Sequence, residues 1–336
     1  MLNKILLISL IPIASFKAFT MTKEEINELK EEYIRPAKVP HPLTNKWSKD
    51  KEKLGKFLFF DPRISGSQWI SCATCHNPGL GFEDGLQLGT GHGMKKLGRH
   101  TPTIINLAWG GPFFWDGRAE TLEDQALGPI ESGAEMNMNL DDAVNRLKKI
   151  SGYVKMFNKV FPESGISKKN IGKAIATFER EVVSNDAPFD KWIKGDEKAI
   201  SEEAKRGFAL FNDKAKCVEC HSGWNFTDHS FHDIGLKSND IGRGKFLPKL
   251  IKMQHAFKTP GLREIQSRAP YMHDGSKQSL REVVDFYNRG GDKRRKSLSD
   301  TIKPLKLTRK ERDDLIAFLK TLDSEPLKIS FPTLPQ

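Results

Sequence analysis

Apolar side chains recur at the three- and four-residue spacing of amphipathic helices along most of this chain. The spacing predicts helices over residues 54–60, 122–127, 140–150, 168–184, 204–211, 280–287 and 308–322. Ser167, Ser279 and Thr308 stand where three of these helices begin, and all three residue types are good N-caps. Runs of alternating β-branched residues, which are typical of strands, are nearly absent. The sequence therefore predicts an all-α protein whose helices are joined by long loops rich in glycine and proline.

A run of turn-forming residues at 185–188 follows the helical pattern of residues 168–184 and predicts a domain boundary. The chain has 336 residues, of which 38% are hydrophobic, and this is enough for two modest cores. We therefore expect a first domain over residues 21–185 and a second over residues 186–336. Residues 331–336, which contain proline, are expected to pack on the surface or to be partly disordered.

The N-terminal residues have the three parts of a secretory signal peptide. A short basic start ends at Lys4, an apolar run follows over residues 5–14, and small residues between 14 and 18 offer cleavage positions. The apolar run is too short to cross a bilayer comfortably, although an uncleaved anchor helix is the alternative. With residues 1–20 as a signal peptide, the mature chain is expected to have no membrane span and to lie in the periplasm.

The formal net charge of the chain is +11 at pH 7. The lysines are scattered and no nucleic-acid-binding module is visible, so nucleic acid is not an expected partner. An acidic redox partner, or solubility alone, accounts for the positive charge.

All four cysteines of the chain lie in two copies of the pattern Cys-x-x-Cys-His. This pattern attaches c-type haem, because the two thiols bond to the haem vinyl groups and the adjacent histidine ligates the iron from the same turn. A redox Cys-x-x-Cys, a pair of disulfides and a zinc site are the alternatives, but a zinc site needs no histidine directly after each second cysteine. We therefore expect two covalently bound haems c, held by Cys72, Cys75 and His76 and by Cys217, Cys220 and His221.

Further segments are unusually rich in Gly, Pro, Trp and His. They lie at residues 58–63, 89–93, 99–103, 114–119, 125–130, 135–136 and 269–276. In this order around the two cysteine motifs, they resemble the bacterial di-haem cytochrome c peroxidase family, which includes the MauG-type enzymes that mature methylamine dehydrogenase. The resemblance covers nearly the whole chain beyond about residue 45. It implies two cytochrome c-like domains, each with one covalent c-type haem.

The resemblance implies different roles for the two haems. In the family the first haem reacts with peroxide and the second transfers electrons, which assigns His76 to the peroxidatic iron and His221 to the electron-transfer iron. His92 matches a histidine that in many relatives also ligates the first iron at rest and swings away on activation. The flanking Gly91 and Gly93 favour such motion. The alternative is an ordinary exposed loop histidine, because some relatives lack this ligand.

Gln125 and Glu135 match the catalytic pair that the family places at the first haem. Peroxide cleavage needs a base that moves a proton from the inner to the outer oxygen, and Glu135 fits that role, while the Gln125 amide can orient peroxide. Trp115 matches the indole that the family places between the haems as an electron relay. The alternatives are solvated helix positions for Gln125 and Glu135, and a packing role for Trp115 that is compatible with the relay.

The most informative departure from the peroxidase branch is Tyr287. The peroxidases use a methionine at this position as the second axial ligand of the second haem. A tyrosine resembles the MauG-type branch instead, and its phenolate favours ferric iron and higher oxidation states. Met253 and Met272 do not fall at the matching position. A packed core tyrosine is the alternative to a Tyr287 ligand.

A calcium ion between the domains is a further implication of the resemblance. The family holds it with an asparagine side chain and backbone carbonyls, and the matching positions here are His100, Arg268 and Pro270. Histidine is a poor ligand for so hard a cation. Binding of a calcium ion that keeps more water ligands is the alternative that stays open, and its protein ligands are not firmly assigned.

These features lead to two enzymatic expectations. The first is a periplasmic di-haem peroxidase that reduces hydrogen peroxide to water with electrons from a small redox protein, a cytochrome c or a cupredoxin. The alternative is a MauG-like enzyme that uses the same chemistry to oxidise residues of a partner protein. Tyr287 favours the alternative and His92 favours the peroxidase. Glu135 and the residues around it argue against a third interpretation, a non-enzymatic di-haem electron carrier.

Overall fold

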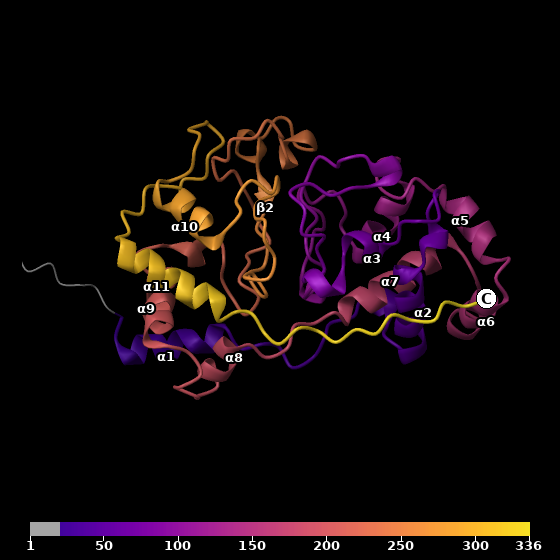
Figure 1. Ribbon diagram of the computed structural model, residues 1–336, viewed down its shortest axis with the longest axis horizontal. Helices are drawn as coiled ribbons and strands as arrows, with labels where there is room; N and C mark the ends of the chain where they lie inside the picture. Colours follow the sequence, from indigo (N-terminus) through magenta and orange to yellow (C-terminus); the bar gives the residue numbers. More distant parts are fainter. Residues whose placement is uncertain (1–20) are drawn as a thin grey trace, which may run out of the picture.

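The structure, a computed structural model, describes residues 21–336, so the predicted signal peptide over residues 1–20 lies outside the described part. Two lobes lie side by side, each made of a few helices and long connecting loops (Figure 1). The first lobe contains α2 (Lys49–Phe60), α3 (Cys72–Cys75), α4 (Leu122–Glu131), α5 (Leu140–Leu147), α6 (Ser151–Val160) and α7 (Lys168–Arg180). The second contains α1 (Lys23–Glu32), α8 (Pro188–Ile193), α9 (Glu202–Asn212), α10 (Leu280–Asn288) and α11 (Arg309–Lys320).

A small sheet accompanies the predicted helices. Strand β1 (Phe231–His232) pairs with β2 (Phe257–Lys258) in an antiparallel ladder. Each strand has only two residues, too short for an alternating pattern to be visible in the sequence. The described part of the chain is therefore mostly helical, with little sheet.

Every helix that the apolar spacing predicts is present in the structure. The three predicted caps are confirmed as well, since the side chains of Ser167, Ser279 and Thr308 each accept a hydrogen bond from the backbone N–H three residues further on. The helix predicted over residues 168–184 ends earlier, at Arg180.

Two helix ends differ from the prediction for local reasons. Beyond α7, the Asn106 side chain accepts from the Ser184 N–H at 3.0 Å, and the Asn106 N–H donates to the Val182 carbonyl at 2.9 Å. These hydrogen bonds replace the backbone hydrogen bonds that would continue the helix. The segment predicted as one helix over residues 140–150 divides into α5 and α6, because Ile150 has an extended backbone and starts a second helix.

One pair of helices crosses at very close range in each lobe. A Cβ atom added to Gly55 of α2 would lie 1.9 Å from the carbonyl oxygen of Ala174 on α7, and one added to Gly207 of α9 would lie 2.0 Å from that of Asp314 on α11. Only glycine permits backbones to approach so closely. These crossings fix the helices that immediately precede each Cys-x-x-Cys-His motif.

Aromatic side chains fill the core of the second lobe. The rings of Phe189, Phe208 and Phe318 lie 5.5 to 5.6 Å apart, centroid to centroid, in edge-on and tilted pairs. The core of the first lobe lies between α2 and α7, where Phe59 and Ile175 are fully buried. The chain passes from one core to the other near the predicted boundary at residue 185.

The two ends of the described chain each pack on the lobe farther away in sequence. Tyr33, at the end of α1, is buried in the second core, and its hydroxyl donates to Asn212 Oδ1 at 2.7 Å. The C-terminal segment runs along the first lobe (Figure 1), where the Phe331 and Phe60 rings lie 5.2 Å apart. Residues 21–33, expected in the first domain, therefore pack with the second, and residues 331–336 pack on the surface of the first.

Polar contacts join the facing sides of the two lobes. The His100 N–H donates to the His273 carbonyl, and the Lys258 N–H donates to the Trp115 carbonyl, both at 2.8 Å. Arg99 bridges Asp116 of its own lobe and Asp240 of the other, at 2.6 and 2.7 Å. Over residues 21–336, none of the helices has the length and apolar character needed to cross a membrane.

We predict that Gly207→Ala destabilises the second lobe. The new methyl group cannot fit against the Asp314 carbonyl, so α9 and α11 must separate, and overpacking of this kind costs about 3 kcal/mol. Denaturant unfolding of the holoprotein measures the loss. Gly98→Ala is the control, because a Cβ there meets no atom within 4 Å. Equal stability of the two variants would contradict the close crossing.

Candidate functional site

A cavity of about 680 Å³ extends between the lobes and is lined by both Cys-x-x-Cys-His motifs. The four cysteines are free thiols and form no disulfide, which removes one of the alternatives left open by the sequence. Burial raises the pKa of the Cys75 thiol to about 11 and that of Cys217 to about 12. The thiols therefore face the cavity as neutral groups.

The two motifs have the same local geometry. In each, the histidine N–H donates to the carbonyl of the first cysteine at 2.8 Å, for His76 to Cys72 and for His221 to Cys217. This turn places both cysteines and the histidine on one side of the chain. In the second motif this geometry is formed by the 3₁₀ turn η6 (Cys217–Glu219) instead of an α-helical turn.

Each motif histidine is oriented by one further hydrogen bond. Nδ1 of His76 lies 3.1 Å from the Phe82 carbonyl, and Nδ1 of His221 lies 2.8 Å from the Phe226 carbonyl. Because a carbonyl only accepts, Nδ1 carries the proton and Nε2 keeps a free lone pair. Burial also lowers the pKa of both imidazoles, which keeps them neutral. This is the arrangement that an iron ligand requires.

The two phenylalanines that accept these bonds have an unusual backbone. Phe82 and Phe226 have φ angles of 58° and 54°, in the left-handed region that bulky residues avoid. Both side chains are almost completely buried in their cores. Core packing therefore holds the strained backbone and turns its carbonyl toward the histidine. The residues of both motifs fit one covalently attached haem each.

The predicted catalytic pair lies at the first motif. Gln125 on α4 and Glu135, in the turn that follows α4, both line the cavity. Gln125 Oε1 is buried without a hydrogen-bond partner among the described residues, as expected of an amide that faces a ligand. The Glu135 N–H donates to the Ser132 carbonyl at 3.0 Å, which sets the direction of the turn.

The loop of His92 is fastened to this turn. The His92 N–H is shared between the carbonyls of Ala134 and Glu135, at 3.0 and 2.8 Å. A Cβ on Gly91 would lie 2.0 Å from the Ala134 carbonyl oxygen, so the close approach needs glycine. The His92 side chain is not among the residues that line the cavity, and its Nδ1 is buried without a partner in the described chain. Its role as an iron ligand stays a prediction.

Trp115 lies where the two lobes meet. Its indole N–H donates to the His100 carbonyl at 2.9 Å, and its own carbonyl accepts from Lys258 of the second lobe. The ring also faces His273 edge-on, with centroids 6.5 Å apart. Trp115 lines the same cavity as both motifs, and its role as an electron relay stays a prediction.

Tyr287 on α10 lines the same cavity beside the second motif. Burial raises the pKa of its phenol above its usual range. Tyr287, Cys217 and Cys220 all line this cavity. Of the two methionines considered from the sequence, Met272 lines the cavity and Met253 does not.

Two ionisable groups in the cavity wall, the buried Glu179 and the half-buried Lys258, were not found from the sequence. Burial raises the pKa of Glu179 on α7 to about 8, and its Oε2 has no hydrogen-bond partner in the described chain. Burial lowers the pKa of Lys258 on β2 to about 8. Both residues look like ordinary surface positions in a sequence with many lysines and glutamates, and only the folded chain brings them to the cavity.

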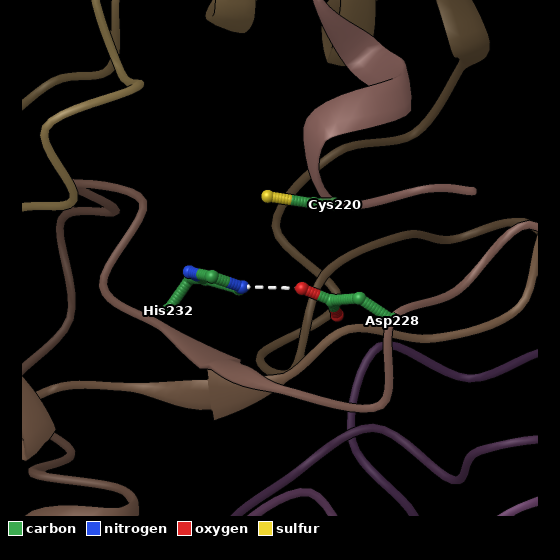
Figure 2. A group of neighbouring side chains, drawn as sticks. All are labelled: Cys220, Asp228 and His232. Carbon is green, nitrogen blue, oxygen red and sulfur yellow. Dashed lines mark hydrogen bonds and ion pairs between the residues drawn. The ribbon is translucent and has the colours of Figure 1, made fainter.

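A third group lies directly against the second motif. Figure 2 shows Cys220, Asp228 and His232, whose ligand atoms all lie within 4.8 Å of one another. His232 Nε2 is 2.8 Å from Asp228 Oδ2, and this bond raises the pKa of His232 to about 10. Because Cys220 belongs to the cysteine motif, we regard the group as part of that site and not as a separate metal centre.

The positions expected to hold calcium have a different chemistry. His100 Nε2 lies 3.0 Å from Glu83 Oε2, and Arg268 Nη1 lies 3.2 Å from Glu83 Oε1. Nitrogen donors and a guanidinium thus stand where a hard cation needs oxygen ligands. These residues do not fit a calcium ion.

Comparison with known proteins places the chain in a family. The family model "Di-haem cytochrome c peroxidase" matches residues 49–198, and the model "Cytochrome c" matches residues 204–323. The chain is 53% identical over 317 residues to "Methylamine utilization protein MauG" of Methylorubrum extorquens, covering 94% of this chain and 90% of that protein. It is 34% identical over 298 residues to "Cytochrome c551 peroxidase" of Pseudomonas aeruginosa, covering 86% and 83%.

A solved structure extends the similarity to the fold. The crystal structure of a MauG-like protein associated with microbial copper homeostasis matches with a TM-score of 0.80 and 32% identity, over 87% of this chain and 94% of that one. The matches span both lobes, so each lobe is a cytochrome c-related domain. With relatives of both kinds at such identity and coverage, the chain belongs to the di-haem cytochrome c peroxidase and MauG family of oxidoreductases.

Proposed function

We propose that this chain is a periplasmic, peroxide-consuming enzyme with two covalent haems c that oxidises residues of a partner protein. The observation that carries the proposal is Tyr287, whose side chain faces the cavity beside Cys217 and Cys220. A phenol at this position offers an oxygen ligand in place of the methionine of the peroxidase branch. The 53% identity to a relative named MauG supports the same choice.

The attachment residues follow from the two motifs. Cys72 and Cys75 would hold the first haem and His76 its iron, while Cys217, Cys220 and His221 would do the same for the second. When bound, the two haems supply the redox-active iron that takes up oxidising equivalents from peroxide.

The side chains of this protein transfer the protons, orient the peroxide and provide an aromatic ring between the domains. Glu135 takes the proton from the inner peroxide oxygen and returns it to the outer one, so that water can leave. Gln125 Oε1, which has no partner among residues 21–336, accepts a hydrogen bond from peroxide and orients it. Trp115 supplies an aromatic ring at the domain contact, held at its indole N–H by the His100 carbonyl.

A donor-dependent peroxidase is the second candidate, in which a small cytochrome c or cupredoxin supplies electrons. One observation favours it: the His92 loop is fastened by two hydrogen bonds to the turn that carries Glu135. A shift of that turn would therefore move the His92 loop as well. A histidine that leaves the iron on activation needs a loop that can move in this way. The similarity to a cytochrome c551 peroxidase supports the same reading.

One experiment separates the two candidates. Holoenzyme and peroxide are mixed with the precursor of methylamine dehydrogenase, the partner of the MauG-type enzymes, or with a reduced small cytochrome c. The proposal expects a peroxide-dependent mass change in the precursor and slow oxidation of the cytochrome. An unmodified precursor together with rapid cytochrome oxidation would establish the donor-dependent peroxidase instead.

Two covalent haems per chain are expected in the denatured protein. Intact-mass spectrometry should give the mass of the mature chain plus two haems, because both motifs present free thiols to the cavity. The double variant Cys217→Ala/Cys220→Ala should retain one. A wild-type mass with a single haem would rule out attachment at one of the motifs.

Replacing Glu135 by glutamine should slow the reaction with peroxide by about 10²-fold, the usual scale for loss of a general base. The resting haem spectra should stay the same, because the amide keeps the shape of the side chain. Stopped-flow absorbance measures the rate. Glu131→Gln, on the exposed end of α4, is the matched control and should react like wild type. A normal rate in Glu135→Gln would mean that another group moves the proton.

Tyr287→Met should raise the reduction potential of the second haem and produce the absorption of a His/Met-ligated iron. The physical reason is that a thioether stabilises ferrous iron better than a phenolate does. Spectroelectrochemistry measures both changes. Tyr271→Phe is the control, because it removes another phenol from the cavity wall. If wild type already shows His/Met absorption, Tyr287 is only a packed side chain.

A further inference from the structure

Three ionisable side chains meet at the contact between the two domains. Glu83 and His100 come from the first domain and Arg268 from the second, and their exposed fractions are 3%, 3% and 5%. Charged groups are rarely buried to this degree unless they pair with one another. We call Glu83, His100 and Arg268 the interface triad.

Glu83 is the centre of the triad. Its Oε2 accepts from His100 at 3.0 Å and its Oε1 accepts from Arg268 at 3.2 Å. His100 Nδ1 lies 2.8 Å from the Leu86 carbonyl, so both ring nitrogens face acceptors and both must donate. His100 is therefore an imidazolium, and the carboxylate of Glu83 lies between two cations.

Two further nitrogens of Arg268 donate to backbone carbonyls of its own domain. Nε donates to the Glu264 carbonyl at 3.1 Å, and Nη2 donates to the Gly261 carbonyl at 2.9 Å. The guanidinium is fixed by these carbonyls and extends across the interface to Glu83. Gly81 allows the approach, since a Cβ there would lie 2.9 Å from Arg268 Cγ.

The triad stands where the family resemblance predicts calcium. A calcium ion takes about six to eight oxygen ligands. Here the backbone carbonyls of Arg268 and Pro270 accept no hydrogen bond within residues 21–336 and would remain as ligands. The Glu83 carboxylate, however, already accepts from two cations. A divalent ion at this point would repel the Arg268 guanidinium and the His100 ring at close range in a medium that screens charge poorly.

We propose that the interface triad replaces calcium as the ionic link between the two domains of this protein. The cationic Arg268 side chain takes the role of the ion: it is held by carbonyls of one domain and paired with a carboxylate of the other. The protein therefore keeps its interdomain geometry without a divalent cation. The proposal concerns the resting protein and does not depend on which of the two enzymatic functions holds.

The first test measures metal and its removal on wild-type holoprotein. After purification without added calcium, elemental analysis should give far less than one calcium per two haems. Treatment with a chelator, or addition of calcium chloride, should leave the haem absorption spectrum and the unfolding temperature unchanged. One calcium per chain, with a spectral change or a lower unfolding temperature after chelation, would overturn the proposal.

The second test breaks the triad itself. Glu83→Gln leaves two buried cations without their carboxylate, so the unfolding temperature should fall by about 5 °C or more. Glu181→Gln is the matched control, because it breaks a His–Glu pair, with His41, that lies within the first domain and is more exposed. Equal unfolding temperatures for Glu83→Gln and wild type would show that the triad does not link the domains.

Discussion

A hydrogen bond from histidine Nδ1 to a phenylalanine carbonyl orients the histidine of the Cys-x-x-Cys-His motif in each domain. His76 and His221 make it to Phe82 and Phe226. Each phenylalanine has a left-handed backbone, which costs roughly 1–2 kcal/mol of folding free energy. Burial of its ring stabilises the folded domain by about the same amount or more. The packed core therefore sets the proton on Nδ1 and leaves Nε2 free, which links the stability of each domain directly to its chemistry.

The same arrangement occurs twice, yet the two sites differ in what faces them. The first motif has a free amide oxygen and a carboxylate, Gln125 and Glu135, suited to proton transfer. The second shares its cavity with the half-buried phenol of Tyr287, an oxygen group of a different kind. The proposed peroxide reaction and the proposed second iron site therefore meet different side chains, and Trp115 lies at the contact between the two domains.

Local features of this protein could be predicted from the sequence, and long-range ones could not. Helices and caps follow from residue spacing, and the cysteine motifs act within a single turn. The carbonyl of Phe226 could not be assigned to His221, because its direction depends on a core assembled from distant helices. Glu179 looked like an exposed helix position, but α7 is buried on nearly every side. Tyr33 was expected in the first domain because it lies early in the chain, but its ring packs in the second core, a contact between segments far apart in sequence.

Several independent contacts fix the two domains relative to each other. Tyr33 fastens the N-terminal helix to the second domain, and Phe331 fastens the C-terminal segment to the first, so both chain ends span the molecule. The His100 N–H bonds to the carbonyl of His273, while the His100 carbonyl accepts the indole N–H of Trp115. His100 therefore connects the interface triad to the proposed relay through a single peptide segment. Because electron transfer weakens steeply with distance, a rigid contact at this point keeps Trp115 at a constant position between the two sites.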